Sequence, residues 1–281
     1  LSRDRELLNL DLNIGGLTLG GSGYQLTVGG GGIDSSGSGV NTIQFNVNAA
    51  DASGQTWIVD SGNTLTLNGN LNGNPNYLIL NSADGGNLNF NGSNNTFSGS
   101  LYLDGNTDQS GVVTITGKMD SLDDLRVANS NGDKATLSLT GDSASIETSS
   151  TITVGNKGVG IFDIESGAKV TANHNTVIGF TTGSNGTINL SGSDSSYTQA
   201  GGQLKIGHDA TGSLTVSDLA EVHTETCFTN IGSRSSGATG TLIVQSGAKY
   251  YGNRIFIGNN AGTTGIVTVT GTGSTATFGN S

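Results

Sequence analysis

The sequence predicts an all-β protein that folds as a single parallel β-solenoid (a β-helix) of about eleven coils, each of roughly 25 residues in three short strands. Three observations support this fold class. An apolar residue followed by Gly recurs at nearly constant intervals, and Val, Ile and Leu alternate with polar residues between turns rich in Gly, Asn, Ser and Asp. Gly supplies 47 of the 281 residues, against a usual share of about 7%. Long runs of helix-forming residues are absent.

The repeat is clearest in the second half of the chain. Its apolar-Gly pairs recur about every 25 residues, and each pair precedes a polar turn and an alternating strand. Because equivalent residues of stacked coils lie above one another, we expect inward side chains to form columns in the core. The predicted column residues are Val154, Ile178, Ile206, Ile231 and Ile257, with Val267 and Val269 in the last alternating strand.

Stacking is required because a repeat of this kind is too small to fold alone. In a stack, each strand pairs in parallel with its equivalent at a spacing of about 4.8 Å. Gly then takes positive φ at corners, and Asn can do the same and form side-chain ladders. A β-propeller is disfavoured because its repeats of about 40–45 residues carry a WD-type signature, which this chain lacks.

Along the chain, residues 1–16 are expected to form a lead-in, a cap or an exchange segment, since the Leu-rich opening is compatible with a strand. The range 17–124 is expected to form irregular coils. The range 125–281 is expected to form the regular repeats, with a spacing of roughly 24–28 residues. The final stretch, 255–281, is expected to be a last coil with an exposed strand edge. Another module, a second copy or a further segment is expected beyond it.

One segment resembles a known family. The stretch 86–106, GNLNFNGSNNTFSGSLYLDGN, is similar to the autotransporter-associated β-strand repeat, and both 53–73 and the C-terminal IGNNAGTTGIVTVTGTGSTATFG resemble segments found in the same proteins. The matching positions are Gly86, Leu88, Phe90, Gly92, Asn94 or Asn95, Phe97 and Gly99. The resemblance implies a right-handed β-helix displayed outside a bacterial cell. The family's C-terminal translocator barrel is not found within these 281 residues. We therefore expect either that the passenger is separated from its barrel or that the protein reaches the outside by another route.

Charge and composition limit the kinds of molecule that this chain is expected to bind. The net charge is −11 and no Lys/Arg cluster is present, so binding to nucleic acid or to anionic membranes is disfavoured. No apolar run approaches the length of a membrane-spanning helix, and no signal segment is present in this chain. We therefore expect no direct membrane insertion. The acidic balance fits a secreted or surface-displayed protein, whose signal segment would then have been removed. The single Cys227 excludes an intramolecular disulfide.

The segment VHTETCF contains three residue types that bind zinc. His223, Glu225 and Cys227 follow one another at i, i+2 and i+4, which is one face of a regular strand. Side chains at this spacing are about 7 Å apart and diverge, so a tetrahedral site needs ligands from neighbouring coils. We therefore expect no metal and no other cofactor, with Cys227 partly buried and His223 exposed.

The densest acidic cluster is Asp120, Asp123 and Asp124. A glycosidase needs two carboxylates on one face about 5–10 Å apart, whereas adjacent residues of a strand point to opposite sides. The cluster is therefore interpreted as a solvated loop.

Two further patterns are attributed to the repeat itself. Lys169 and Lys249 occupy equivalent turn positions in ESGAKV and QSGAKY. The segment GGGGID at 29–34 matches the start of a calcium-binding nonapeptide, but Ser36 replaces the apolar residue of that motif and no tandem copy follows. Neither pattern predicts a site.

These observations predict a non-enzymatic extracellular structural or adhesive protein of a bacterium. Its expected partners are copies of itself, other surface or matrix molecules, and glycans. Two alternatives remain open: a subunit that stacks end to end into a filament, and a β-helical polysaccharide lyase or glycosidase.

Overall fold

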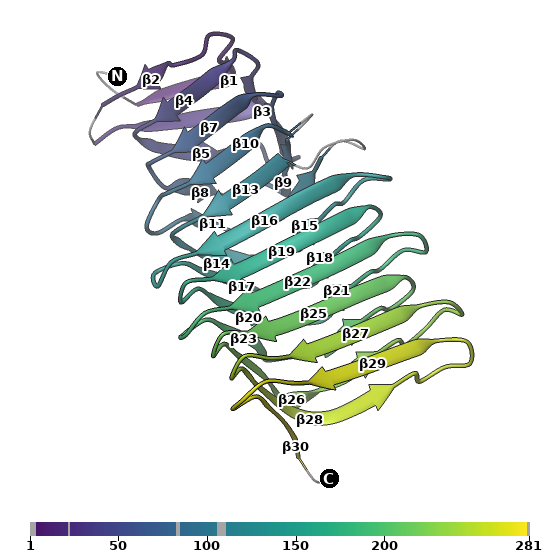
Figure 1. Ribbon diagram of the computed structural model, residues 1–281. Helices are drawn as coiled ribbons and strands as arrows, with labels where there is room; N and C mark the ends of the chain where they lie inside the picture. The colour runs from purple at the N-terminus through teal and green to yellow at the C-terminus, as the bar shows by residue number, and fades with distance from the viewer. Residues whose placement is uncertain (1–3, 22, 83–84, 106–110, 280–281) are drawn as a thin grey trace.

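A computed structural model describes residues 4–21, 23–82, 85–105 and 111–279 of the chain. The predicted fold class is confirmed: parallel strands stack in about eleven coils of roughly 25 residues, and no α-helix occurs among the described residues. In Figure 1 the coils descend from the N-terminal end to the C-terminal end as one ladder.

Each coil contributes one strand to an eleven-stranded sheet. Its strands are β2 (Thr18–Leu19), β4 (Gly39–Ile43), β7 (Asn63–Leu67), β10 (Asn87–Phe90), β13 (Gly111–Ile115), β16 (Lys134–Thr140), β19 (Val159–Glu165), β22 (Asn185–Ser191), β25 (Thr211–Ser217), β27 (Thr239–Val244) and β29 (Thr264–Val269).

The remaining strands form a nineteen-stranded sheet. They are β1 (Arg5–Asp11), β3 (Gln25–Ser35), β5 (Asn46–Ala49), β6 (Gln55–Val59), β8 (Leu71–Gly73), β9 (Tyr77–Asn81), β11 (Thr96–Phe97), β12 (Ser100–Asp104), β14 (Lys118–Leu122), β15 (Leu125–Val127), β17 (Ser145–Thr148), β18 (Ile152–Val154), β20 (Lys169–Ala172), β21 (Thr176–Ile178), β23 (Ser196–Gln199), β24 (Gln203–Ile206), β26 (Glu221–Ile231), β28 (Lys249–Ile257) and β30 (Thr275–Phe278).

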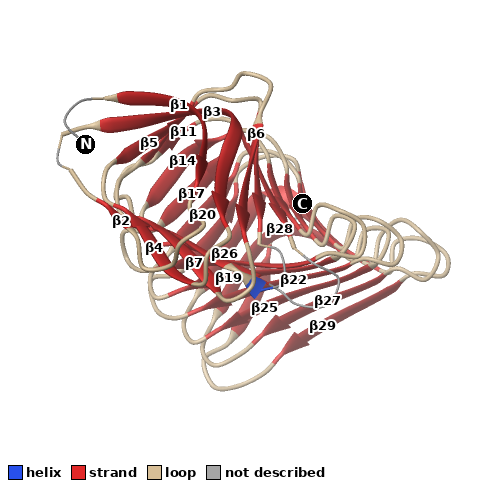
Figure 2. Cartoon of the chain, turned by 90° about the horizontal axis from the view of Figure 1, so that it is seen from above, coloured by secondary structure: helices blue, strands red, loops and turns tan. Residues whose placement is uncertain are grey.

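The nineteen-stranded sheet covers two sides of the coil. The long strand β26 pairs with β23 through its first residues and with β24 through its last. Strands β3 and β28 likewise run along both of these sides without a break. We call the eleven-stranded sheet the first face, the side containing β17, β20 and β23 the second face, and the side containing β15, β18, β21 and β24 the third face. Seen from above, the strands lie on three sides with loops at the corners (Figure 2).

The column residues stand in register from coil to coil. Val154 pairs with Ile178, Ile178 with Ile206, and Ile206 with Ile231, and all four are 0% exposed. Ile257 continues the column beside Ile231 but is 51% exposed, because it lies in the last described coil. In the same coil Val267 and Val269 pair with buried Leu242 and Val244; Val267 is partly buried and Val269 is exposed.

A glycine follows each member of this column and fixes the distance between coils. Gly155, Gly179, Gly207 and Gly232 all have φ between 67° and 72°, which is the left-handed region. A Cβ on Gly232 would lie 2.2 Å from the carbonyl oxygen of Thr264 in the next coil. These glycines are therefore required both for the turn and for the close approach of the following coil.

The coil length over 17–124 is more regular than the sequence pattern indicates. On the first face, Thr18, Thr42, Thr66, Asn89 and Thr114 are consecutive partners, and their positions in the chain advance by nearly the same step from coil to coil. In residues 17–124 the apolar-Gly pairs no longer recur at a regular spacing, but the strands of successive coils still pair in register. The strand β1, inside the expected lead-in segment, pairs in parallel with β3.

Two buried tyrosine hydroxyls are paired with threonine hydroxyls of the neighbouring coil. The buried Tyr197 hydroxyl lies 2.5 Å from Thr176 Oγ1, and Tyr250 repeats the arrangement two coils later with Thr229 at 2.6 Å. Burial raises the pKa of both phenols, that of Tyr250 to about 12. Both rings therefore remain neutral parts of the core.

Candidate interaction surfaces

The three residues of zinc-binding type, His223, Glu225 and Cys227, do not share one face. Strand β26 loses its regular register between Thr224 and Phe228, so the strict alternation assumed for VHTETCF is wrong at this point. His223 and Glu225 remain at the surface, with Nδ1 and Oε1 3.1 Å apart, whereas Cys227 is 5% exposed and donates to the carbonyl oxygen of Gln199. Among the described residues, no group of three potential ligands converges on one point.

The acidic cluster at 120–124 is only partly a solvated loop. Asp120 and Asp123 are exposed, but Asp124 is 6% exposed, so its expected solvation is wrong. Asp124 lies at the corner between β14 and β15, and its Oδ2 accepts a 2.7 Å hydrogen bond from Arg126 Nε. Burial raises the pKa of Asp124 despite this opposing charge. Its Oδ1 is buried with no hydrogen-bond partner in the described chain.

A pair of carboxylates, half-buried Asp104 and buried Asp133, was not anticipated from the sequence. Asp104 Oδ2 accepts a hydrogen bond from Ser130 Oγ at 3.0 Å, and Asp133 Oδ2 accepts one from the Ser130 backbone N–H at 3.2 Å. Burial raises the pKa of both carboxyl groups, and the charge of Asp104 raises that of Asp133 further. The two acids lie in neighbouring coils, so only the strand register reveals their proximity.

The two repeat-related lysines occupy one outward column of the second face. Lys169 and Lys249 open β20 and β28 and are separated in the column by Ser196 and Glu221. Lys249 Nζ lies 2.9 Å from Glu221 Oε1, and this contact lowers the pKa of Glu221 and raises that of Lys249. Both lysines are therefore surface elements of the ladder. The segment 29–34 lies within β3.

The residues that carry the family resemblance have clear positions in the coil. Leu88, Phe90 and Phe97 are buried, at 1% exposure or less. Of the two candidate asparagines, Asn95 fastens the corner: its Oδ1 accepts the Leu71 N–H at 2.7 Å, and its Nδ2 donates to two backbone carbonyls. The motif thus corresponds to a strand whose apolar side chains point into the core, followed by a turn that the side-chain amide of Asn95 holds in place.

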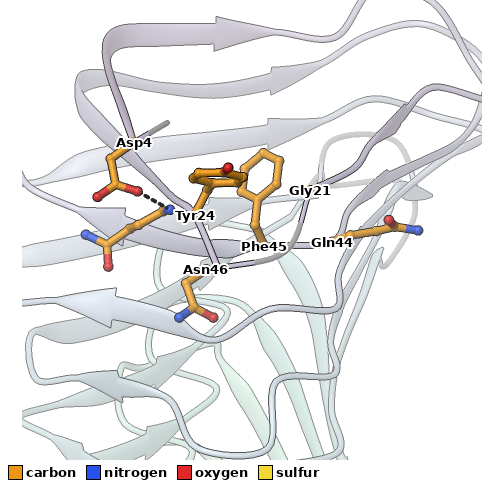
Figure 3. A pocket seen from close by; sticks show the side chains of 8 residues that line it. Asp4, Gly21, Tyr24, Gln44, Phe45 and Asn46 are labelled. Atoms are coloured by element: carbon orange, nitrogen blue, oxygen red, sulfur yellow. Dashed lines mark hydrogen bonds between the residues drawn. The ribbon is translucent and has the colours of Figure 1, made fainter. Parts of the chain in front are cut away.

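A hollow of about 690 Å³ lies near the N-terminal end, beside the turns that join β2 to β3 and β4 to β5. Figure 3 shows the rings of Tyr24 and Phe45 side by side there, with Gln44 and Asn46 at its rim. Its one charged lining residue, Asp4, already accepts the Gln25 N–H at 2.9 Å. The hollow therefore offers few free groups to orient a ligand.

The first face presents a repeating polar array. One outward column runs through all eleven coils. From β4 onward a second column lies beside it, two residues earlier along each strand; it includes Thr187 and Thr241 and also the apolar residues Val40, Val112, Ile161 and Ile266. The first column is Thr18, Thr42, Thr66, Asn89, Thr114, Ser138, Asp163, Asn189, Thr215, Ile243 and Thr268. In Figure 1 this sheet forms the broad front of the molecule.

No family model, no curated protein and no solved structure matches this chain. In the part of the chain that the structure describes, no helix is long and apolar enough to cross a membrane.

Proposed function

We propose that this chain is a non-enzymatic structural or adhesive β-solenoid that acts outside a bacterial cell. The observation that carries the proposal is the uninterrupted outward column of mainly Thr, Ser and Asn residues across the eleven coils of the first face. A rigid surface with one repeating chemistry favours many weak contacts over one deep pocket. Such contacts gain strength through multivalency. The acidic composition and the resemblance to the autotransporter-associated repeat support an extracellular setting.

Adhesion through the first face can be tested with beads coated with the purified chain. We expect coated beads to aggregate, and the variant Thr187→Glu/Thr241→Glu to reduce aggregation, because it places carboxylates on the array. A matched control is Thr171→Glu/Thr198→Glu, which adds the same charge to outward positions of the second face. Equal loss in both variants, or no aggregation of the unmodified chain, would count against the proposal. Release of reducing or unsaturated ends from polysaccharides would instead support the enzymatic alternative.

A second candidate function is end-to-end assembly with other copies of this chain. It is favoured by apolar residues at both edges of the described stack: Leu8 and Ile14 are 75% and 73% exposed at one edge, and Ile257 is 51% exposed at the other. An apolar hollow of about 510 Å³ also opens between β1 and β2. Exposed parallel strand edges are templates for further pairing.

The assembly is testable by electron microscopy and light scattering over a concentration series. We expect rods that lengthen with concentration, and we expect Ile257→Lys to prevent them because it charges the open edge. Thr187→Lys, which adds the same charge to the middle of the first face, is the control. Monodisperse single stacks at high concentration argue against this function.

A further inference from the structure

The third face contains a groove at its centre. Thr153 and Val177 point outward, because Ile152, Val154 and Ile178 on either side of them point into the core. Outward residues of an exposed sheet are normally accessible, yet Thr153 is only 6% exposed and Val177 only 5%. Neighbouring side chains and corner turns therefore rise above the sheet on this face, and the two residues form a groove floor.

Side chains at the two ends of the strands form the walls of the groove, and the stacking of the coils extends it along the molecule. One wall carries Phe180, 39% exposed, whose ring stacks on His208 of the next coil with centroids 6.0 Å apart. The opposite wall carries Asn175. Two hollows of about 320 and 410 Å³ share Asn175 and Lys205, so the groove continues from one coil to the next.

Two cations mark the groove of this acidic protein. Arg126, Thr153, Val177 and Lys205 are successive partners in one outward column, which separates the two cationic residues by three coil steps, or about 14 Å along the stack. Arg126 pairs with Asp124. Lys205 is half-buried and forms no ion pair within the described residues, whereas three other cationic side chains do.

Asp124 adds an unmet hydrogen-bonding requirement at one end of the groove. Its side chain lines the hollow of about 320 Å³, and the residue is only 6% exposed. The Thr151 backbone N–H lowers the pKa of this carboxyl group, but Oδ1 accepts no hydrogen bond of normal geometry from the described residues. A buried oxygen of this kind is costly to leave without a donor. A ligand hydroxyl that enters the hollow would supply that donor.

From this geometry we propose that the third-face groove binds an extended acidic polysaccharide, such as a uronate-containing chain. Carboxylates of the ligand pair with Lys205 and with the exposed side of Arg126, a hydroxyl donates to Asp124 Oδ1, and a sugar ring packs against Phe180. The open, elongated shape suits a linear chain lying across several coils. A mixture of one apolar wall and a few placed polar groups is typical of ligand sites.

Nucleic acid fits the same groove less well. A polyanion with a phosphate at every nucleotide is recognised by dense basic clusters, whereas this groove has two separated cations on a chain of net charge −11. The predicted ligand therefore carries both hydroxyls and widely spaced acidic groups.

The proposal can be tested by calorimetric titration of the folded chain with oligogalacturonate, oligomannuronate and a sulfated galactan oligosaccharide. Methyl-esterified oligogalacturonate serves as the uncharged match, and a single-stranded oligonucleotide as the alternative polyanion. The informative variant is Lys205→Gln. Its control is Lys169→Gln, which removes the same charge from an exposed position of the second face. Phe180→Ala tests the apolar wall independently, and circular dichroism verifies that every variant is folded.

We expect at least one acidic oligosaccharide to bind, its methyl ester to bind at least tenfold more weakly, and Lys205→Gln to reduce affinity about tenfold or more. Lys169→Gln should leave affinity unchanged, and Phe180→Ala should weaken it. The proposal is overturned if none of the three acidic chains binds at millimolar concentration, or if both lysine variants lose affinity equally. Oligonucleotide binding that is tighter and equally dependent on Lys205 would also overturn it.

Discussion

The column through Ile231 and Ile257 permits a stability comparison within one molecule. The perturbation is Ile→Ala at each position separately. The two residues are direct partners in β26 and β28, and both precede a glycine of positive φ. They therefore share strand position and local conformation. They differ in burial: Ile231 is 0% exposed and Ile257 is 51% exposed.

The expected free-energy changes follow from this difference. Ile→Ala removes three carbon groups, which at about 0.8 kcal/mol each gives about 2.4 kcal/mol for a fully buried side chain. At Ile231, coils on both sides hold the backbone in place, so the cavity cannot collapse and adds about 1 kcal/mol. We expect a loss of about 3–4 kcal/mol for Ile231→Ala. For Ile257→Ala we expect about 1 kcal/mol, because half of the side chain is already in water and no closed cavity forms.

The assay is urea unfolding followed by far-ultraviolet circular dichroism, with the slope of the transition compared between variants. Equal losses for the two variants in a sample shown to be monomeric would refute the reasoning. Equal losses in an associated sample would instead indicate that a second copy covers Ile257. Light scattering on the same samples separates the two cases.

Three further predictions follow from the coil interior and its acids. Gly258→Ala should lower the free energy of unfolding only by the strain of a left-handed residue, about 1–2 kcal/mol, because the nearest carbonyl oxygen is 3.6 Å from the added Cβ. Gly232→Ala should lower it clearly more, because the added Cβ would lie 2.2 Å from a carbonyl oxygen. Urea unfolding measures both losses. Tyr197→Phe should cost about 1–3 kcal/mol because it leaves the Thr176 hydroxyl buried and unpaired, and adding Thr176→Val should restore part of that loss in a double-mutant cycle. Burial raises the folded-state pKa of Asp104 above its unfolded value, so its destabilising contribution is present at neutral pH and disappears as the pH falls through the folded-state pKa. Thermal unfolding between pH 7 and pH 4.5 should therefore show a smaller acid-induced gain in stability for Asp104→Asn than for the unmodified chain, and identical profiles would contradict the assignment.

The fold was predictable because its signals are local and repeated. Alternation places Ile178 and Ile206 on the inward face, and the glycine after each marks the corner, so register follows from spacing alone. In the first half the same register persists although the sequence pattern is weak. There, inward positions accept several apolar residue types, and an amide such as Asn95 fastens the corner.

The candidate groove was not predictable in the same way. Alternation indicates that Thr153 and Val177 point outward, but not that walls cover them, because Asn175 and Phe180 lie outside the strands, in the corners at either end of β21. Corners also break the period-two rule. Cys227 is buried where β26 loses its regular register, so reading the strand pattern onward from His223 gives the wrong side there. Asp124 lies on the outward side with Arg126, but the corner buries it.

The positive-φ glycines also bear on how such a chain changes length during evolution. The corners at Gly155, Gly179, Gly207 and Gly232 leave room only for the backbone of the following coil, placed by its own register. Insertion or loss of a few residues within a coil displaces that backbone into the glycine corner. Duplication or deletion of one whole coil preserves every contact between neighbours. Length variation among descendants of this sequence is therefore expected in steps of a full coil, with changes of other sizes confined to the outer loops.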